Sequence, residues 1–113
     1  MDPLNIENVN FSVLSNCDEE SKRLYKAQRE TRGFDDTETW NLDLTILKFT
    51  LPRLQRFREL CKNHPEEMEE EEWLKLLDDA IYAIDMVVNH AFDYSSYEKE
   101  IQALFTNLRY LWW

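Results

Sequence analysis

The fold class follows from the stretch Trp73-Leu-Lys-Leu-Leu-Asp-Asp-Ala-Ile-Tyr-Ala-Ile-Asp-Met-Val-Val-Asn-His-Ala91. Its apolar residues recur every three or four positions, so they share one face of a helix. Glu69 to Glu72 stand just before it, where carboxylates oppose the positive end of the helix dipole. We therefore predict an amphipathic helix over residues 68–91. Its apolar face comprises Trp73, Leu76, Leu77, Ala80, Ile81, Ile84, Val87, Val88 and Ala91.

Helices are also expected on both sides of this stretch. After it, Ser95 and Glu98 have the spacing of a capping box, which predicts a helix over residues 95–112. Before it, a broad apolar stripe predicts a central helix over residues 36–62, capped by Asp36 or Thr37 and kinked or broken at Pro52. The central stripe comprises Leu42, Ile46, Leu47, Phe49, Leu51, Leu54, Phe57, Leu60 and Cys61, and the C-terminal one Ile101, Leu104, Phe105, Leu108, Leu111 and Trp112.

The first third of the chain has a weaker pattern. Ser15, with Asp18 three residues later, predicts the start of a charged surface helix over residues 15–32. Gly33 is expected to end it, because glycine enters the left-handed region freely. Residues 1–14 are expected to be an extended arm packed on the domain, or a flexible one.

The composition favours a single all-α domain. A chain of 113 residues is long enough for one packed core. It contains one glycine and three prolines, whereas strand-rich folds need many tight turns. We predict one domain over residues 1–113, a compact helical bundle of three to four main helices with an extended N-terminal arm.

The charge limits the classes of partner. The chain has 23 acidic and 13 basic residues, a net charge of −10. Direct binding to DNA or RNA needs clustered Lys and Arg, so it is not expected. A protein that itself binds nucleic acid is a better-matched partner, because carboxylates can mimic phosphates. The alternative explanation of the acidic charge is that it keeps the protein soluble.

The sequence begins without a basic and apolar leader, and it has no apolar run of bilayer length. Cys17 and Cys61 do not have the spacing of metal ligands. We therefore expect a cytoplasmic protein that needs no membrane, metal or cofactor.

Bases and acids are also segregated along the chain. Five bases and one acid lie between Lys48 and Lys62, whereas acids dominate from His64 to Glu100. The bases can form structural ion pairs with the acidic helix that follows. Alternatively, they can face Asp35, Asp36 and Glu38 and form a mixed-charge pocket.

Enzymatic activity is not expected. Ser, Cys and His residues occur, but no local motif joins them into a nucleophilic site. The run Glu66-Glu67-Met68-Glu69-Glu70, followed by Asp78, Asp79 and Asp85, is compatible with the Mg²⁺ site of an all-α nucleotide pyrophosphohydrolase. Such a site needs a second acidic pair on a facing helix, which the sequence does not supply.

Two groups of residues are candidates for binding a partner. The first is the acidic, aromatic start of the central helix, which can meet arginines of another protein. With two arginines it can instead form a pocket that sequesters a nucleotide signal. The second is the C-terminus, where outward aromatic side chains favour a partner or a homodimer. For Trp40 a core position is favoured, and for Asp35 and Asp36 the surface. The candidates are Asp35, Asp36, Glu38, Trp40, Asp43, Arg53, Arg56, Tyr110 and Trp113.

Three segments resemble one family. The segment Phe34-Asp-Asp-Thr-Glu-Thr-Trp-Asn-Leu-Asp-Leu-Thr-Ile-Leu-Lys-Phe-Thr-Leu-Pro-Arg-Leu-Gln-Arg-Phe57 is similar to the signature of small bacteriophage and prophage proteins. The segment Glu-Glu-Glu-Glu-Trp-Leu-Lys-Leu-Leu-Asp from Glu69 and the ending Leu-Phe…Leu-Arg-Tyr-Leu-Trp112 resemble the rest of that family. The resemblance covers roughly residues 33–113 and supplies no established activity. It implies a viral protein in the host cytoplasm that binds a host macromolecule, such as a defence nuclease, and inhibits or redirects it.

Overall fold

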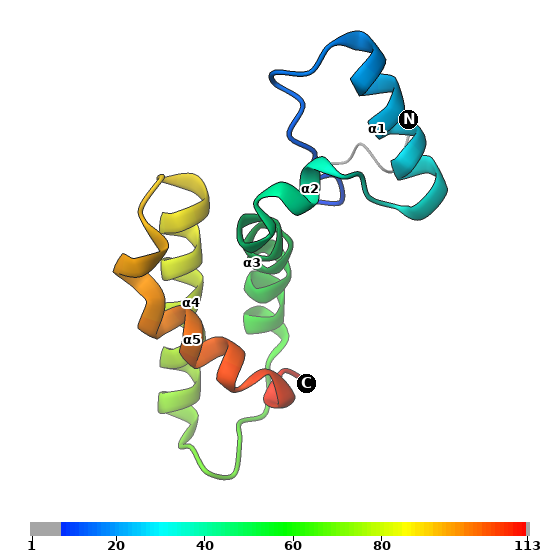
Figure 1. Ribbon diagram of the computed structural model, residues 1–113. Coiled ribbons are helices and arrows are strands. Elements are labelled where there is room, and N and C mark those ends of the chain that lie inside the picture. Colours follow the sequence, from blue (N-terminus) through cyan, green and yellow to red (C-terminus); the bar gives the residue numbers. More distant parts are fainter. Residues whose placement is uncertain (1–7, 113) are drawn as a thin grey trace. The chain divides into compact units, whose positions relative to one another are not determined.

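The computed structural model describes residues 8–112, and this part of the chain is helical without strands. The all-α prediction is therefore confirmed for these residues. The chain divides into two compact units, the first ending at Phe49 and the second beginning at Thr50. Figure 1 shows, in order, α1 (Glu19–Arg32), α2 (Thr37–Trp40), α3 (Leu42–Leu60), α4 (Glu70–Asn89), the 3₁₀ turn η2 (Tyr94–Tyr97), α5 (Glu98–Thr106) and the 3₁₀ turn η3 (Leu108–Tyr110).

Helix α1 has a side-chain cap at one end and a glycine at the other. The Asp18 carboxylate accepts a hydrogen bond from the Ser21 backbone N–H at 2.7 Å, so Asp18 rather than Ser15 caps the helix. Gly33 has φ 89°, and its N–H donates to the Arg29 carbonyl at 2.8 Å. The predicted end of this helix at Gly33 is confirmed.

The segment predicted as one helix over residues 36–62 contains two helices. Asn41, with φ −128° and ψ 68°, separates α2 from α3, and its carbonyl accepts the first hydrogen bonds of α3, from Leu44 and Thr45. The Thr45 hydroxyl also donates to the Glu38 carbonyl at 2.7 Å, which satisfies an acceptor at the end of α2. The break therefore falls at Asn41, and α3 continues through Pro52 to Leu60.

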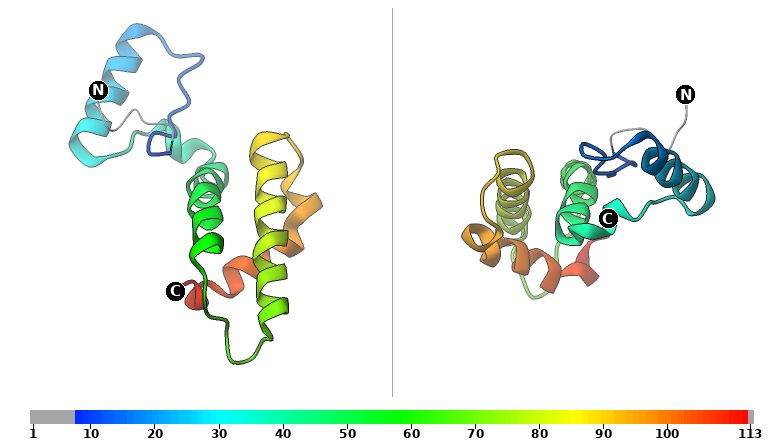
Figure 2. Two further views of the ribbon diagram at one scale, coloured as in Figure 1. Left: turned by 180° about the vertical axis from the view of Figure 1, so that it is seen from behind. Right: turned by 45° about the horizontal axis from the view of Figure 1, so that its top comes forward.

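The second unit has a core built mainly from α4 and α5. These helices lie side by side in both views of Figure 2, and α4 runs antiparallel to the part of α3 after Phe49 (Figure 1). The Arg58 side chain reaches from α3 to Asp78 on α4, with Nε 2.9 Å from the carboxylate. This is the kind of structural ion pair that the segregated charges predicted. The buried apolar residues of this unit are Leu51, Leu54, Trp73, Leu77, Ala80, Ala83, Ile84, Val87, Ile101 and Leu104.

Both ends of the α4–α5 connection differ from prediction. Ala91, expected on the apolar face, is exposed and has φ 57°, while the N–H groups of His90 and Phe92 both donate to the Met86 carbonyl. Helix α4 thus ends in a left-handed residue that is not glycine. The next cap is Asp93, whose carboxylate accepts from the Ser95 N–H at 3.3 Å, in place of the predicted capping box.

The C-terminal segment also faces differently from the prediction. Helix α5 ends at Thr106 and gives way to the tighter turn η3, which rotates the following side chains relative to an α-helix. Leu108 and Trp112, expected in the core, are 52% and 66% exposed. Tyr110, expected to point outward, is half-buried and packs edge-on against Trp73, with ring centroids 6.4 Å apart. Trp113 lies outside the described residues.

Candidate binding surfaces

The acidic motif of the first unit surrounds a buried ion pair. Asp35 and Arg29 are 0% and 5% exposed, and their side chains meet at 2.7 Å. Asp35 also accepts hydrogen bonds from the Ser12 hydroxyl and from the Thr37 backbone N–H, the latter at 2.8 Å. The surface position expected for Asp35 is therefore wrong. Its burial is possible because α1 supplies a guanidinium six residues upstream, and because Ser12 and Thr37, outside α1, add neutral donors.

Glu38 extends this network to the N-terminal segment. It is buried, and its carboxylate accepts from the backbone N–H groups of Asp35 at 2.7 Å and Phe11 at 3.1 Å. The Val13 N–H donates to the Thr37 hydroxyl at 2.9 Å. These bonds attach residues 11–13 to the turn before α2. Asp35 and Glu38 are thus in position to order the local backbone, while their side chains are not open to a partner.

The electrostatics of the two neighbouring aspartates differ. Burial raises the pKa of Asp35, but hydrogen bonds from Ser12, Thr37 and Arg29 outweigh it, so the net pKa lies below the ordinary value. Asp36 is exposed, and a hydrogen bond from Arg32, at 2.6 Å, is the main cause of its lowered pKa. The bases that meet these two acids come from α1. Sequence reasoning missed Arg29 and Arg32, because nothing in their spacing indicates that α1 folds back on the motif.

An apolar groove lies beside this network in the first unit. Its cavity volume is about 540 Å³. Leu42, Ile46 and Phe49 follow one another along a single face of α3, and they are 53%, 43% and 50% exposed. The prediction that these three belong to a buried stripe is therefore wrong. The apolar lining is Val9, Phe11, Phe34, Leu42, Ile46 and Phe49, completed by Gly33, Glu38, Thr39 and Thr45.

Aromatic side chains shape this groove and its surroundings. The rings of Phe11 and Phe49 meet edge-on with centroids 6.5 Å apart, and the Arg32 guanidinium lies 4.4 Å from the centroid of Phe34. Trp40, at the end of α2, is 82% exposed, so the core position favoured for it is wrong. The groove is thus an exposed apolar surface on a chain of net charge −10.

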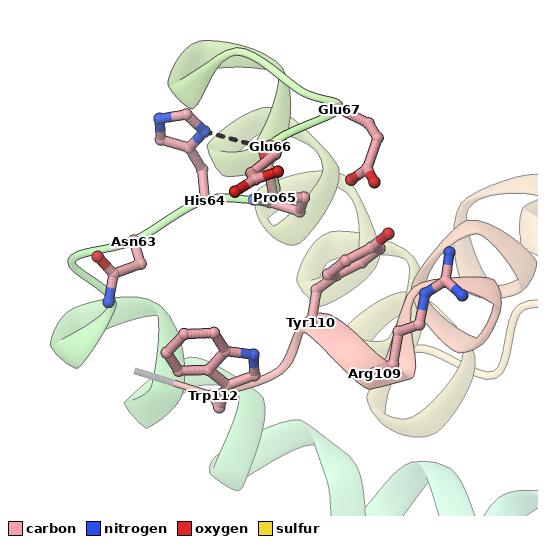
Figure 3. A pocket seen from close by; sticks show the side chains of 8 residues that line it. All are labelled: Asn63, His64, Pro65, Glu66, Glu67, Arg109, Tyr110 and Trp112. Carbon is pink, nitrogen blue, oxygen red and sulfur yellow. Dashed lines mark hydrogen bonds between the residues drawn. The ribbon is translucent and has the colours of Figure 1, made fainter.

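A second, more polar pocket lies in the second unit and has a volume of about 440 Å³ (Figure 3). One wall is the loop after α3, and the other is the C-terminal segment. The Arg109 guanidinium lies 4.9 Å from the centroid of the Tyr110 ring. The lining residues are Asn63, His64, Pro65, Glu66, Glu67, Arg109, Tyr110 and Trp112.

His64 is fixed at the rim of this pocket. Its Nδ1 lies 3.0 Å from the Pro65 carbonyl oxygen and 2.8 Å from that of Met68, so Nδ1 carries the proton. The Pro65 hydrogen bond is the main cause that raises the pKa of His64, and the charges of Glu69 and Glu70 add to it.

The remaining predicted site residues are distributed over both units. Asp43 is exposed at the start of α3 in the first unit. Arg53 and Arg56 are exposed on the part of α3 in the second unit, and Arg56 pairs with Glu59 at 2.8 Å.

In residues 8–112, no three His, Cys, Asp or Glu side chains converge as metal ligands, and no helix is long and apolar enough to span a membrane. Comparisons with protein-family models, with curated proteins and with solved structures gave no match to this chain.

Proposed function

We propose that this chain is a non-enzymatic interaction protein of bacteriophage type, which binds a host protein in the cytoplasm and inhibits or redirects it. The groove of the first unit is the docking surface in this proposal, and the exposed Trp40 follows the lining residue Thr39 in the sequence. Val9 and Phe11, which precede α1, line one side of the groove. The observation that supports the proposal is an exposed apolar groove in a chain of net charge −10.

The exposed apolar side chains are the first argument. Single exposed apolar residues are normal, whereas a contiguous group marks a surface that another molecule covers. Phe34, Leu42, Ile46 and Phe49 are each at least two-fifths exposed and line one cavity. Trp40 adds an indole that is 82% exposed, and tryptophan is enriched among residues that dominate interface energies.

The rigidity of the groove is the second argument. Phe34 precedes the buried Asp35, and the Phe11 backbone N–H donates a hydrogen bond to the carboxylate of the buried Glu38. The ion pair of Asp35 with Arg29 ties this wall to α1. Because the walls are ordered before binding, a partner does not lose affinity to the cost of ordering them.

The expected occupant is an apolar segment of a host protein with lysines or arginines beside it. The excess of carboxylates on this chain attracts such a segment and repels acidic competitors. Asp43, next to Leu42, is exposed and forms no ion pair within residues 8–112. Host proteins that bind nucleic acid, including defence nucleases, carry basic surfaces of this kind.

The test uses two substitutions of matched chemistry in the first unit. Ile46→Glu places a charge in the groove, whereas Leu24→Glu places one at a position on α1 that is 56% exposed and lies outside the groove lining. Tagged wild-type chain and both variants are used to capture partners from host lysate, and captured proteins are identified by mass spectrometry. Binding to the purified partner is then measured by calorimetry.

The expected result is one stoichiometric partner for the wild type and for Leu24→Glu, with binding by Ile46→Glu at least about tenfold weaker, since a buried charge without a partner is costly. Circular dichroism checks that both variants remain helical. Loss of the partner in both variants, or in neither, contradicts the groove as docking surface. A groove-dependent homodimer in sedimentation, without a host partner, would replace the proposed occupant by a second copy.

A further inference from the structure

The polar pocket of the second unit has two walls that the chain holds in place. In the C-terminal wall, the N–H of Leu111 donates to the Leu108 carbonyl at 3.0 Å, and that of Trp112 to the Tyr110 carbonyl at 2.9 Å. In the opposite wall, the Met68 N–H donates to the carbonyl of Pro65 at 3.1 Å, and Pro65 is buried. The pocket is therefore bounded by turns with internal hydrogen bonds rather than by free loop.

The C-terminal wall presents an aromatic ring that the core does not use. Tyr110 contributes to packing, because its ring meets Trp73. Trp112 is 66% exposed, and its indole stands at the pocket with Tyr110 on the same chain segment (Figure 3). The carboxylates of Glu66 and Glu67 lie on the other wall of the same pocket (Figure 3), and an open indole face is a surface on which proteins bind organic cations.

The charges of the pocket favour a cation. Glu66 and Glu67 are exposed and form no ion pair within residues 8–112. Arg109 is the only lysine or arginine among the described lining residues, and its guanidinium lies against the Tyr110 ring. The described lining thus contains two carboxylates, one guanidinium and His64, whose pKa is raised, so its net charge is negative while His64 is neutral.

We propose that this pocket binds the side chain of an arginine presented by another protein. The planar guanidinium would stack on the Trp112 indole and place its N–H groups toward the carboxylates of Glu66 and Glu67. Arginine is preferred to lysine because its flat, weakly hydrated cation suits an aromatic face. The site shares no lining residue with the apolar groove, and its chemistry does not depend on what the groove binds.

A phosphate or carboxylate ligand is the competing possibility, with Arg109 as its partner. The two readings predict opposite effects of removing Arg109. For an arginine ligand, Arg109 is a repelling charge, so Arg109→Gln strengthens binding. For an anionic ligand, the same substitution weakens binding.

The experiment titrates the full chain with N-acetyl-L-arginine amide and follows the Trp112 indole N–H by two-dimensional NMR. N-acetyl-L-citrulline amide is the matched probe, because it keeps the shape and planarity of arginine and lacks the charge. The expected result is saturable movement of the Trp112 signal with arginine, and binding of citrulline at least about fivefold weaker. Trp112→Phe assigns the signal, and an unchanged Trp73 signal shows that the fold is intact.

Variants then test the individual groups. Trp112→Ala and the double variant Glu66→Gln with Glu67→Gln should each weaken arginine binding several-fold, and Arg109→Gln should strengthen it about twofold or more. The control is the double variant Glu20→Gln with Glu71→Gln, which removes the same charge outside the pocket lining. The proposal is overturned if the citrulline probe binds as tightly as the arginine probe, if arginine binding does not saturate by about 50 mM probe, or if the control variant weakens binding equally. It is also overturned if Arg109→Gln weakens binding of the arginine probe while inorganic phosphate binds saturably.

Discussion

Asp35 illustrates how one residue can have a role opposite to its appearance in the sequence. It stands in the acidic segment from Asp35 to Glu38, where solvent exposure is the normal expectation. In the folded chain, its carboxylate is enclosed and accepts hydrogen bonds from Arg29, Ser12 and Thr37. A buried ion pair contributes little when intact, but loss of one partner leaves an isolated charge in a low-dielectric site.

The first prediction concerns Asp35→Asn. This change keeps the shape of the side chain and leaves the Arg29 guanidinium buried without a counter-ion, so we expect the free energy of unfolding of the first unit to fall by about 3–5 kcal/mol. Urea unfolding followed by circular dichroism measures it. The matched control is Asp36→Asn, which removes an exposed partner of Arg32 and should cost much less, because solvent screens an exposed ion pair. Equal losses in the two variants would show that burial of Asp35 has no energetic weight.

The second prediction is the pH dependence of the same contact. The pKa of Asp35 is lowered below its ordinary value of 3.8, so the unfolded chain takes up the proton more readily than the folded one. The stabilisation is therefore present above the ordinary pKa and is lost as the pH falls through the lower pKa of the folded state. We expect the difference in urea midpoint between wild type and Asp35→Asn to be largest near about pH 6 and to shrink below about pH 4. A difference that stays constant down to about pH 2.5 would contradict this assignment.

At the scale of elements, α4 could be predicted from the sequence, because the spacing of its apolar residues alone indicates a helix. The break at Asn41 could not be predicted, since it depends on a single residue and on the Thr45 hydroxyl. The groove could not be predicted for another reason. Leu42, Ile46 and Phe49 have the same spacing whether they face a core or a partner, so periodicity cannot separate the two.

The two left-handed helix ends provide the third prediction. Gly33 and Ala91 both have positive φ, and only glycine adopts it without strain. A Cβ at Gly33 would meet no atom within 4 Å, so the cost of Gly33→Ala is conformational alone and should be about 1 kcal/mol. Ala91→Gly should change stability in the opposite direction, by a gain of about 0.5–1 kcal/mol, because the strain is removed at some cost in chain entropy. Thermal unfolding measures both, and effects of the same sign would refute the shared cause.

At the scale of the whole molecule, charge is the dominant feature. The chain has ten more acids than bases, as 23 minus 13. Its ion pairs are mostly exposed and local, such as Arg56 with Glu59 and Lys75 with Asp79. Such pairs contribute about 0–1 kcal/mol each, and their partners are too close together for moderate salt to screen them fully. Repulsion among the unpaired carboxylates acts over longer distances and is screened more strongly.

The fourth prediction is therefore that salt stabilises this chain. The Debye length falls from about 30 Å at 0.01 M to about 10 Å at 0.1 M, so raising NaCl across this range should remove most of the long-range repulsion. We expect Tm to rise by about 2–6 °C, the shift that about 1 kcal/mol gives in a domain of this size. The double variant Glu66→Gln with Glu67→Gln reduces the net negative charge from −10 to −8 and removes no ion pair formed within residues 8–112, so its Tm should respond less to salt. A fall in Tm with added NaCl would mean that attraction within the local pairs outweighs the excess of negative charge.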